Sequence, residues 1–315
     1  MAQPAATAED AGLQAALKAL AARSDRKGLA RLAGHLALLA ATGALVLWSR
    51  GSWAGASWAG ASWTVAPALL AHGIVLVFLF APLHETIHRT AFRSRALNDA
   101  VARAAGFLLL LPADYFRAFH LQHHRYTQDR ARDPELAGPP LAGRGGYLWH
   151  VTGLPYWRER LATTCRHALG RVGEDFVTEH RRPAIVREAR WHLAGYALVA
   201  AASLAAGSTL VLWLWVLPAL LGQPFLRLYL LAEHSGCPEV DDMLANSRTT
   251  LTSPLLRALC WNMNLHTAHH AHPALPFHAL PAADRLLAPR MAVRSRGYIR
   301  VQREIWEALA ARAGS

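Results

Sequence analysis

The sequence has few cysteines, few charges and no recognisable cofactor-binding segment. Its three cysteines, Cys165, Cys237 and Cys260, form no CxxC pair, which excludes a disulfide framework and a cysteine-based zinc site. Neither a GxGxxG segment nor a His-Pro-Gly-Gly segment occurs, so no dinucleotide-binding or fused haem-binding module is indicated. Only 17% of the 315 residues are charged, whereas 53% are hydrophobic. This apolar excess favours a protein that crosses a membrane.

Four apolar stretches approach the length of a membrane span, because a bilayer core of about 30 Å takes about 20 helical residues. They cover residues 29–48, 63–83, 191–206 and 210–232. The last two are separated only by residues 207–209, which predicts a helical hairpin. A fifth stretch, 101–111, is too short to span and ends at Pro112, so we expect it to be re-entrant or interfacial. The sequence predicts an all-α integral membrane protein with four transmembrane helices.

The basic residues predict the orientation of these helices. Lys and Arg number 33 against 21 Asp and Glu, a net charge of +12. Most of the arginines lie between the second and third spans, whereas the two opposite loops carry only Arg50. The positive-inside rule therefore puts both termini and the long middle segment in the cytoplasm. This distribution accounts for the positive charge without a nucleic-acid partner, and we expect none.

Two further segments carry expectations of their own. Residues 1–23 are rich in alanine and carry interspersed charges without a compact apolar stretch, so we expect a cytosolic lead-in rather than a secretory signal. Between the first two spans, Ser-Trp-Ala-Gly-Ala begins at Ser52 and again at Ser57. Tryptophans at this spacing suggest an aromatic belt at the membrane surface.

Most of the 17 histidines fall into clusters. His84 and His88 are four residues apart, two HxxHH segments follow, and His234 stands alone at the end of the fourth span. Residues at i, i+3 and i+4 share a helical face, and the predicted topology puts all of these residues on one side of the membrane. The converging residues would be His84, His88, His120, His123, His124, His234, His266, His269 and His270.

Nine converging imidazoles predict a metal site. Imidazole binds zinc, copper, iron and nickel, so the spacing does not choose the metal. Nine ligands are too many for one ion and suggest two. His35 and His72 lie within predicted spans, away from this plane, and are left out of the site; we expect His72 to form hydrogen bonds between helices.

The first cluster also permits another interpretation. His84 and Glu85 begin an HExxH segment, which in an intramembrane zinc protease would supply two zinc ligands and a general base. That hypothesis predicts one zinc ion and leaves both HxxHH segments unexplained. With two metals, Glu85 is instead expected to orient an imidazole. Asp133 and His278 are further candidates for residues that support the ligands.

The three clusters, read as HETIH, HLQHH and HTAHH, resemble the histidine boxes of the membrane fatty acid desaturase and hydroxylase superfamily. The resemblance covers residues 78–287. It extends to Arg-Tyr-Thr at residues 125–127, Asp-Pro-Glu at 133–135, Ala-Glu-His-Ser-Gly at 232–236 and Pro-Phe-His-Ala-Leu-Pro at 276–281. This combination looks most like the bacterial lipid desaturase branch.

The resemblance implies a non-haem di-iron centre that uses O₂ and two electrons to attack an unactivated C–H bond. The eight box histidines would be iron ligands, and His234 matches the extra histidine that members carry ahead of the third box. One position departs from the pattern of animal stearoyl desaturases, which have an asparagine where this chain has Leu230. Electrons would come from a separate protein, ferredoxin-like or similar, together with a reductase.

The resemblance favours desaturation of a fatty acyl chain that is linked to a lipid, to coenzyme A or to a carrier. Hydroxylation of a lipid, alkyl or carotenoid substrate is the alternative, and nothing in the boxes decides between them. A third hypothesis is a membrane protein that binds or transports metal without catalysis. We expect a cytosolic lead-in over 1–28, a membrane desaturase-like domain over 29–287 capped by cytoplasmic helices, and a cytosolic helix over 288–315. The expected location is a bacterial inner membrane.

Overall fold

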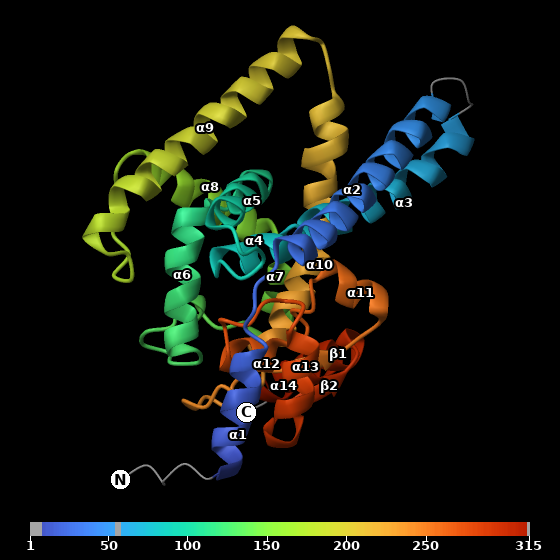
Figure 1. Cartoon of the computed structure of the whole chain (residues 1–315). Coiled ribbons are helices and arrows are strands. Elements are labelled where there is room, and N and C mark those ends of the chain that lie inside the picture. Colours follow the sequence, from blue (N-terminus) through green and yellow to red (C-terminus); the bar gives the residue numbers. More distant parts are fainter. Residues whose placement is uncertain (1–7, 54–57, 314–315) are drawn as a thin grey trace.

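The computed structural model describes residues 8–53 and 58–313 and is mostly helical (Figure 1). The longest helices are α2 (Asp25–Trp53), α3 (Trp58–Val77), α9 (Arg182–Ala205) and α10 (Leu217–His234). Residues 54–57 of the Ser-Trp-Ala-Gly-Ala repeat lie outside the described residues, whereas its ends belong to α2 and α3. The other helices are α1 (Ala8–Ala19), α4 (Phe80–Ile87), α5 (Arg95–Leu108), α6 (Ala113–Tyr126), α7 (Gly143–Val151), α8 (Leu154–Ala168), α11 (Pro254–Leu259), α12 (His266–Ala271), α13 (Leu280–Leu287) and α14 (Tyr298–Ala313).

Three helical segments in the described residues are long and apolar enough to cross a membrane: 25–51, 64–87 and 212–234. They correspond to the first, second and fourth predicted spans. The third predicted span forms the apolar half of α9 but is not among these segments. The first half of α9 carries Arg187, Glu188 and Arg190, and its apolar half is short for a bilayer.

A bent pair of helices provides a fourth membrane segment if it is one broken span. Helices α5 and α6 meet at 100° across a short break, which contains the end of the stretch expected to be re-entrant. Leu110 in the break has a positive φ of 54°, and Pro112, the N-cap residue of α6, has no N–H to donate. The Glu188 carboxylate of α9 accepts hydrogen bonds from the N–H groups of Ala113 and Asp114, at 3.0 and 2.7 Å. These bonds fix the start of α6.

Helices α3 and α10 approach closely through two glycines. A Cβ atom at Gly73 would lie 2.3 Å from the carbonyl oxygen of Pro218, and one at Gly222 would lie 2.2 Å from the carbonyl oxygen of Gly73. Neither helix has room for a side chain there. His72 adds hydrogen bonds of 2.9 Å to the Thr42 hydroxyl and 3.0 Å to the Leu214 carbonyl, so its expected role between helices is confirmed.

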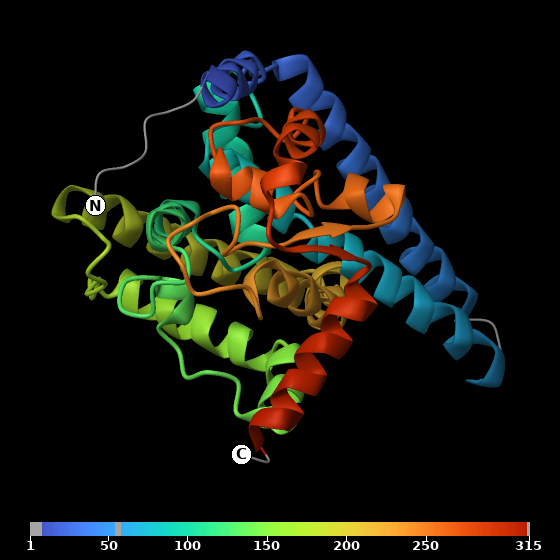
Figure 2. The same ribbon diagram turned by 90° about the horizontal axis from the view of Figure 1, so that it is seen from below.

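The segments after α10 cover one end of the long helices, at the bottom of Figure 1 and in the centre of Figure 2. They include short parallel strands, β1 (Thr249–Leu251) and β2 (Arg294–Arg296), which pair in register from Thr249 and Arg294. Leu17 of α1 joins Trp261 and Phe277 in the core of this cap. Short helical turns η1 (Pro134–Leu136), η2 (Glu179–Arg181), η3 (Leu212–Val216) and η4 (Ala288–Arg290) complete the elements.

Candidate metal centre

The nine histidines singled out from the sequence come from four helices whose ends meet. Helix α4 and its C-cap carry the first box, α6 carries the second, α12 carries the third, and His234 is the last residue of α10. Within each box the spacing of three or four residues puts the imidazoles on one face. The structure brings all nine together in two adjoining groups.

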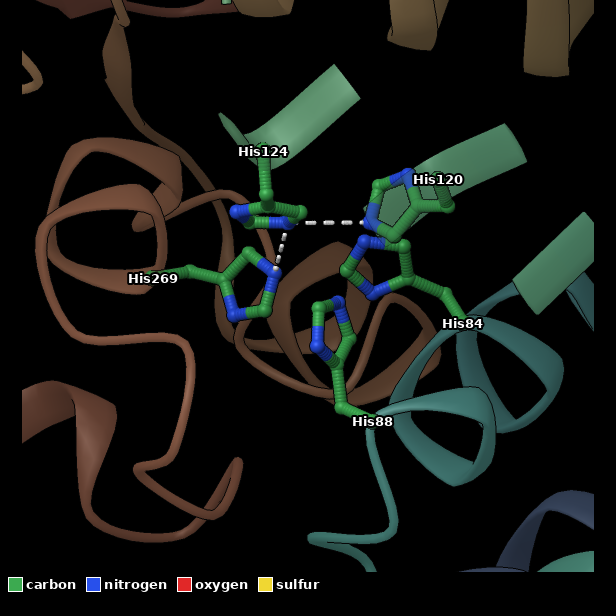
Figure 3. Close-up of side chains that lie close together, drawn as sticks. All are labelled: His84, His88, His120, His124 and His269. Atoms are coloured by element: carbon green, nitrogen blue, oxygen red, sulfur yellow. Dashed lines mark hydrogen bonds between the residues drawn. The ribbon is translucent and has the colours of Figure 1, made fainter. Parts of the chain in front are cut away.

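The first cluster consists of five histidines from three helices (Figure 3). One ligand nitrogen from each of these residues lies within 4.8 Å of all the others. His124 Nε2 is 3.0 Å from His120 Nε2 and 3.1 Å from His269 Nε2. The residues of the first cluster are His84, His88, His120, His124 and His269.

The second cluster lies beside the first. Nitrogens of His123, His234 and His270 lie within 4.8 Å of one another, and His266 Nε2 is 3.0 Å from His234 Nε2, so we include His266. The ring centroids of His124 and His270 are 4.1 Å apart, which shows how closely the two clusters adjoin.

The unpaired nitrogens of both clusters fit metal ions. Among the described residues, buried nitrogens without a hydrogen-bond partner include both ring nitrogens of His84, Nε2 of His88 and Nε2 of His270. Buried polar atoms normally have a partner, and a metal ion provides one. Ring nitrogens of neighbouring histidines lie only 3.0–3.1 Å apart, close enough for two of them to bind the same ion.

The protonation states in α12 also suit metal binding. Burial, and then the neighbouring histidines, hold the pKa values of His266, His269 and His270 well below the ordinary value of 6.5. These imidazoles are therefore neutral near pH 7, and neutral imidazole is the form that binds a metal.

In the second cluster, the Nδ1 atoms of three of the four rings form a hydrogen bond with an oxygen atom. His123 Nδ1 lies 3.0 and 3.1 Å from the two carboxylate oxygens of Asp133, and His234 Nδ1 lies 3.1 Å from the Asn246 carbonyl oxygen. Carboxylates and carbonyls only accept hydrogen bonds, so both Nδ1 atoms carry the proton. Nε2 of these two rings is then left with a lone pair for a metal.

Of the other two rings, His270 follows the same arrangement, whereas His266 Nδ1 makes only an ion-pair contact. The Thr127 hydroxyl donates to the His123 carbonyl at 2.8 Å and accepts from His270 Nδ1 at 3.2 Å. A longer contact of 3.4 Å joins His266 Nδ1 to the Glu233 carboxylate.

The first cluster lacks these acceptors. Among the described residues, Nδ1 of His84, His120, His124 and His269 has no hydrogen-bond partner. Three of the four rings of the second cluster are therefore held by hydrogen bonds at Nδ1, whereas His266 Nδ1 shares with the first cluster the lack of a hydrogen-bond partner among the described residues.

The three residues expected to support the ligands behave differently. Asp133 contacts a ring of the second cluster, as described. Glu85 Oε1 instead accepts the backbone N–H of Phe277 at 2.9 Å, which ties α4 to the segment before α13. His278 is partly buried, and its Nε2 has no partner among the described residues.

Sequence reasoning missed three residues that contact the ligands: Thr127, Glu233 and Asn246. Thr127 belongs to the Arg-Tyr-Thr segment at 125–127 and Glu233 to the Ala-Glu-His-Ser-Gly segment at 232–236. These positions are a sequence signal, but the signal does not say what the residues contact. Asn246 contacts His234 through its backbone carbonyl, and any residue type could supply that group. No sequence signal identifies such a contact.

A narrow apolar cavity reaches His84. Its walls are mostly apolar and include Phe78, Phe80, Leu226 and Met263, together with Glu233, and its volume is about 10 Å³. Apolar walls suit a hydrocarbon chain. A chain could enter only if the side chains of the cavity moved apart.

Comparison with known proteins agrees with the geometry. The fatty acid desaturase family model matches residues 61–302, a range that contains every histidine of both clusters. A search of curated proteins found no match. Because the matched range covers well over half of the sequence and includes the candidate metal centre, the chain belongs to the fatty acid desaturase family.

Proposed function

We propose that the protein is an O₂-dependent, non-haem di-iron desaturase that introduces a double bond into a fatty acyl chain. The observation that carries this proposal is the convergence of nine histidines into two adjoining clusters with unpaired buried nitrogens, in a chain of the desaturase family. An intramembrane zinc protease would bind one zinc ion with His84, His88 and a third ligand, a carboxylate or a histidine, and would leave the second cluster without a role.

Each cluster would hold one iron. The first iron would be bound by the five residues of the first cluster and the second by His123, His234, His266 and His270. An iron pair supplies the oxidising power that breaks an unactivated C–H bond with O₂, which zinc cannot do because it does not change oxidation state. Leu230 lies one turn before His234 and has no polar atom to offer a metal.

The residues of the chain position the site and keep it dry. Asp133, Thr127 and the Asn246 carbonyl fix the Nδ1–H tautomer, so that Nε2 points inward. The imidazoles of α6 and α12 are buried, which protects a reactive oxidant from water. The apolar cavity beside His84 would receive the acyl chain.

The overall reaction balances with an external electron donor. Desaturation removes two hydrogen atoms from adjacent carbons, and O₂ accepts these together with two electrons and two protons to give two water molecules. We propose that a ferredoxin-like protein and its reductase supply the electrons. The proposed location is a bacterial inner membrane, with the metal centre and both termini in the cytoplasm.

Lipid analysis of a host that expresses the protein tests the reaction. We expect fatty acyl chains lighter by two hydrogens, and we expect His124→Ala to abolish them. His180, which is exposed and outside both clusters, provides a matched control, since His180→Ala should leave the product unchanged. Chains heavier by one oxygen would instead identify a hydroxylase, and an unchanged lipid profile would contradict both.

A further inference from the structure

A buried group of hydrogen-bond donors lies between α8 and α10, apart from the metal centre. In the described residues, four N–H-bearing groups there have no hydrogen-bond partner. We call this group the donor cluster; its members are the amide of Gln223, Nε1 of Trp157, Nε of Arg160 and Nε of Arg227. Three of the side chains are almost fully buried, with exposed fractions of 1% for Gln223, 9% for Trp157 and 8% for Arg160.

Contacts between the two helices bring these residues together. Gln223 packs against Gly153, where an added Cβ atom would lie 2.3 Å from Gln223 Cγ. The Arg227 guanidinium lies 4.4 Å from the ring centroid of Tyr156, and the Arg160 guanidinium lies 5.9 Å from the same centroid. Both cations therefore face one aromatic ring.

Arg227 lacks a carboxylate partner. No hydrogen bond or ion pair joins it to the described residues, although Glu135 and Glu159 are near enough to act on its charge. Arg160, by contrast, pairs with Glu159. Arg227 also lies in the apolar segment 212–234, where a charged side chain is costly and marks a functional site.

The chemistry of the donor cluster indicates which kind of group it would bind. Apart from the Gln223 carbonyl oxygen, its unpaired atoms are all donors, and two of them belong to cations. Leaving a buried donor without an acceptor costs free energy, more so for a charged group. A group with several acceptor oxygens and a negative charge would satisfy them together, and phosphate and carboxylate both match arginine in this way.

We propose that the donor cluster binds the oxyanion at the head of the acyl substrate, a phosphate or a carboxylate. This proposal rests on the proposed acyl-chain function. Arg227 is seven residues before His234, about 10 Å along the helix, so the head would be anchored close to the second cluster. The enzyme would then select the carbon to be attacked by its distance from the head group, whatever the length of the chain.

Binding of small amphiphiles to the full-length, iron-loaded protein tests the proposal. The probes are decanoate and dioctanoyl phosphatidic acid, with decanol as the uncharged probe and inorganic phosphate as the anion without a chain. We expect at least one acyl oxyanion to bind about tenfold or more tightly than decanol, because hydrogen bonds to charged groups are strong. Decanoate and phosphatidic acid then distinguish a carboxylate from a phosphate head.

Substitution of Arg227 identifies the site. Arg227→Met should weaken binding of the preferred oxyanion about tenfold or more. Arg158→Met, on exposed Arg158 of the same helix as Arg160, should change nothing. Equal binding by wild type and Arg227→Met would overturn the proposal. So would equal losses in both variants, or inorganic phosphate binding as tightly as the acyl probes.

Folding and catalysis are tested separately from binding. Without added probe, Arg227→Met should melt no lower than the wild type, because it removes a charge that lacks a carboxylate partner, and the Met side chain can still pack against Tyr156. If this variant does not fold, Arg227→Lys retains the charge and should weaken binding by an intermediate factor. If the wild type binds the probe through Arg227 but makes no unsaturated product, only the proposed reaction fails. If it desaturates while Arg227→Met binds normally, only the head-group site fails.

Discussion

Replacement of Asp133 by asparagine should weaken one metal position and spare the other. The buried Asp133 carboxylate accepts from His123 Nδ1 at 3.0 and 3.1 Å, from the Gln128 N–H at 3.0 Å and from the Glu135 N–H at 2.9 Å. Each carboxylate oxygen therefore accepts one hydrogen bond from the His123 ring and one from a backbone N–H group. In asparagine one of them becomes an NH₂ group, which would face a donor instead of accepting from it.

The expected magnitude follows from the loss of this support. Removal of a group that orients a metal-bound histidine typically weakens metal binding about 10- to 100-fold, which corresponds to about 1.4–2.7 kcal/mol. Asp133 contacts His123 but no ring of the first cluster. The loss of affinity should therefore be confined to the iron that the second cluster would bind.

Chelator titration followed by iron analysis measures this effect. Half of the iron in Asp133→Asn should be lost at about 10- to 100-fold lower free chelator than in the wild type, and the other half should be lost as in the wild type. Asp129→Asn is the matched control, because Asp129 is partly exposed and pairs with Arg132 on the surface and should leave both curves unchanged. Identical curves for Asp133→Asn and the wild type would refute the assignment of His123 to a metal.

Two further predictions concern stability. Gly222→Ala should cost about 1–3 kcal/mol by overpacking, because its Cβ would meet the Gly73 carbonyl. It should lower the melting temperature, whereas Gly138→Ala, with open space around its Cβ, should not; equal melting would contradict this packing. Burial acts to raise the pKa of Glu174, but the hydrogen bond from His167 helps to lower it from 4.5 to about 2. Its contribution is therefore present above pH 4.5 and lost as the pH falls toward 2; a Glu174→Gln variant should show a shallower acid-side loss of stability, measured by thermal unfolding, and an unchanged slope would count against this role.

The sequence predicts the convergence of the histidines because its signals are local. The spacing within each box puts the imidazoles on one helical face, and the spans before His84 and His234 are apolar enough to bring the boxes to one end of the helices. The third predicted span is not among the segments long and apolar enough to cross a membrane, because charged residues occupy the first half of α9. When an apolar run is too short to span the bilayer core as a helix, the sequence does not reveal whether that helix crosses the membrane.

The division of the boxes between two clusters required the structure. His120 and His124 belong to the first cluster, but His123 belongs to the second, although all three share one helix. Similarly, His269 separates from His270. Residues at i and i+4 lie almost above one another, whereas i+3 is offset around the helix. Which histidines of the other helices each face meets depends on how α4, α6 and α12 pack against one another. That packing is a tertiary property.

The most direct test of the di-iron proposal is the metal content of the purified protein. We predict two irons per chain for the wild type, with iron lost in His124→Ala, which alters the first cluster, and in His270→Ala, which alters the second. His180→Ala should retain both irons. One zinc per chain, or two irons that remain fully bound in both cluster variants, would contradict the proposal.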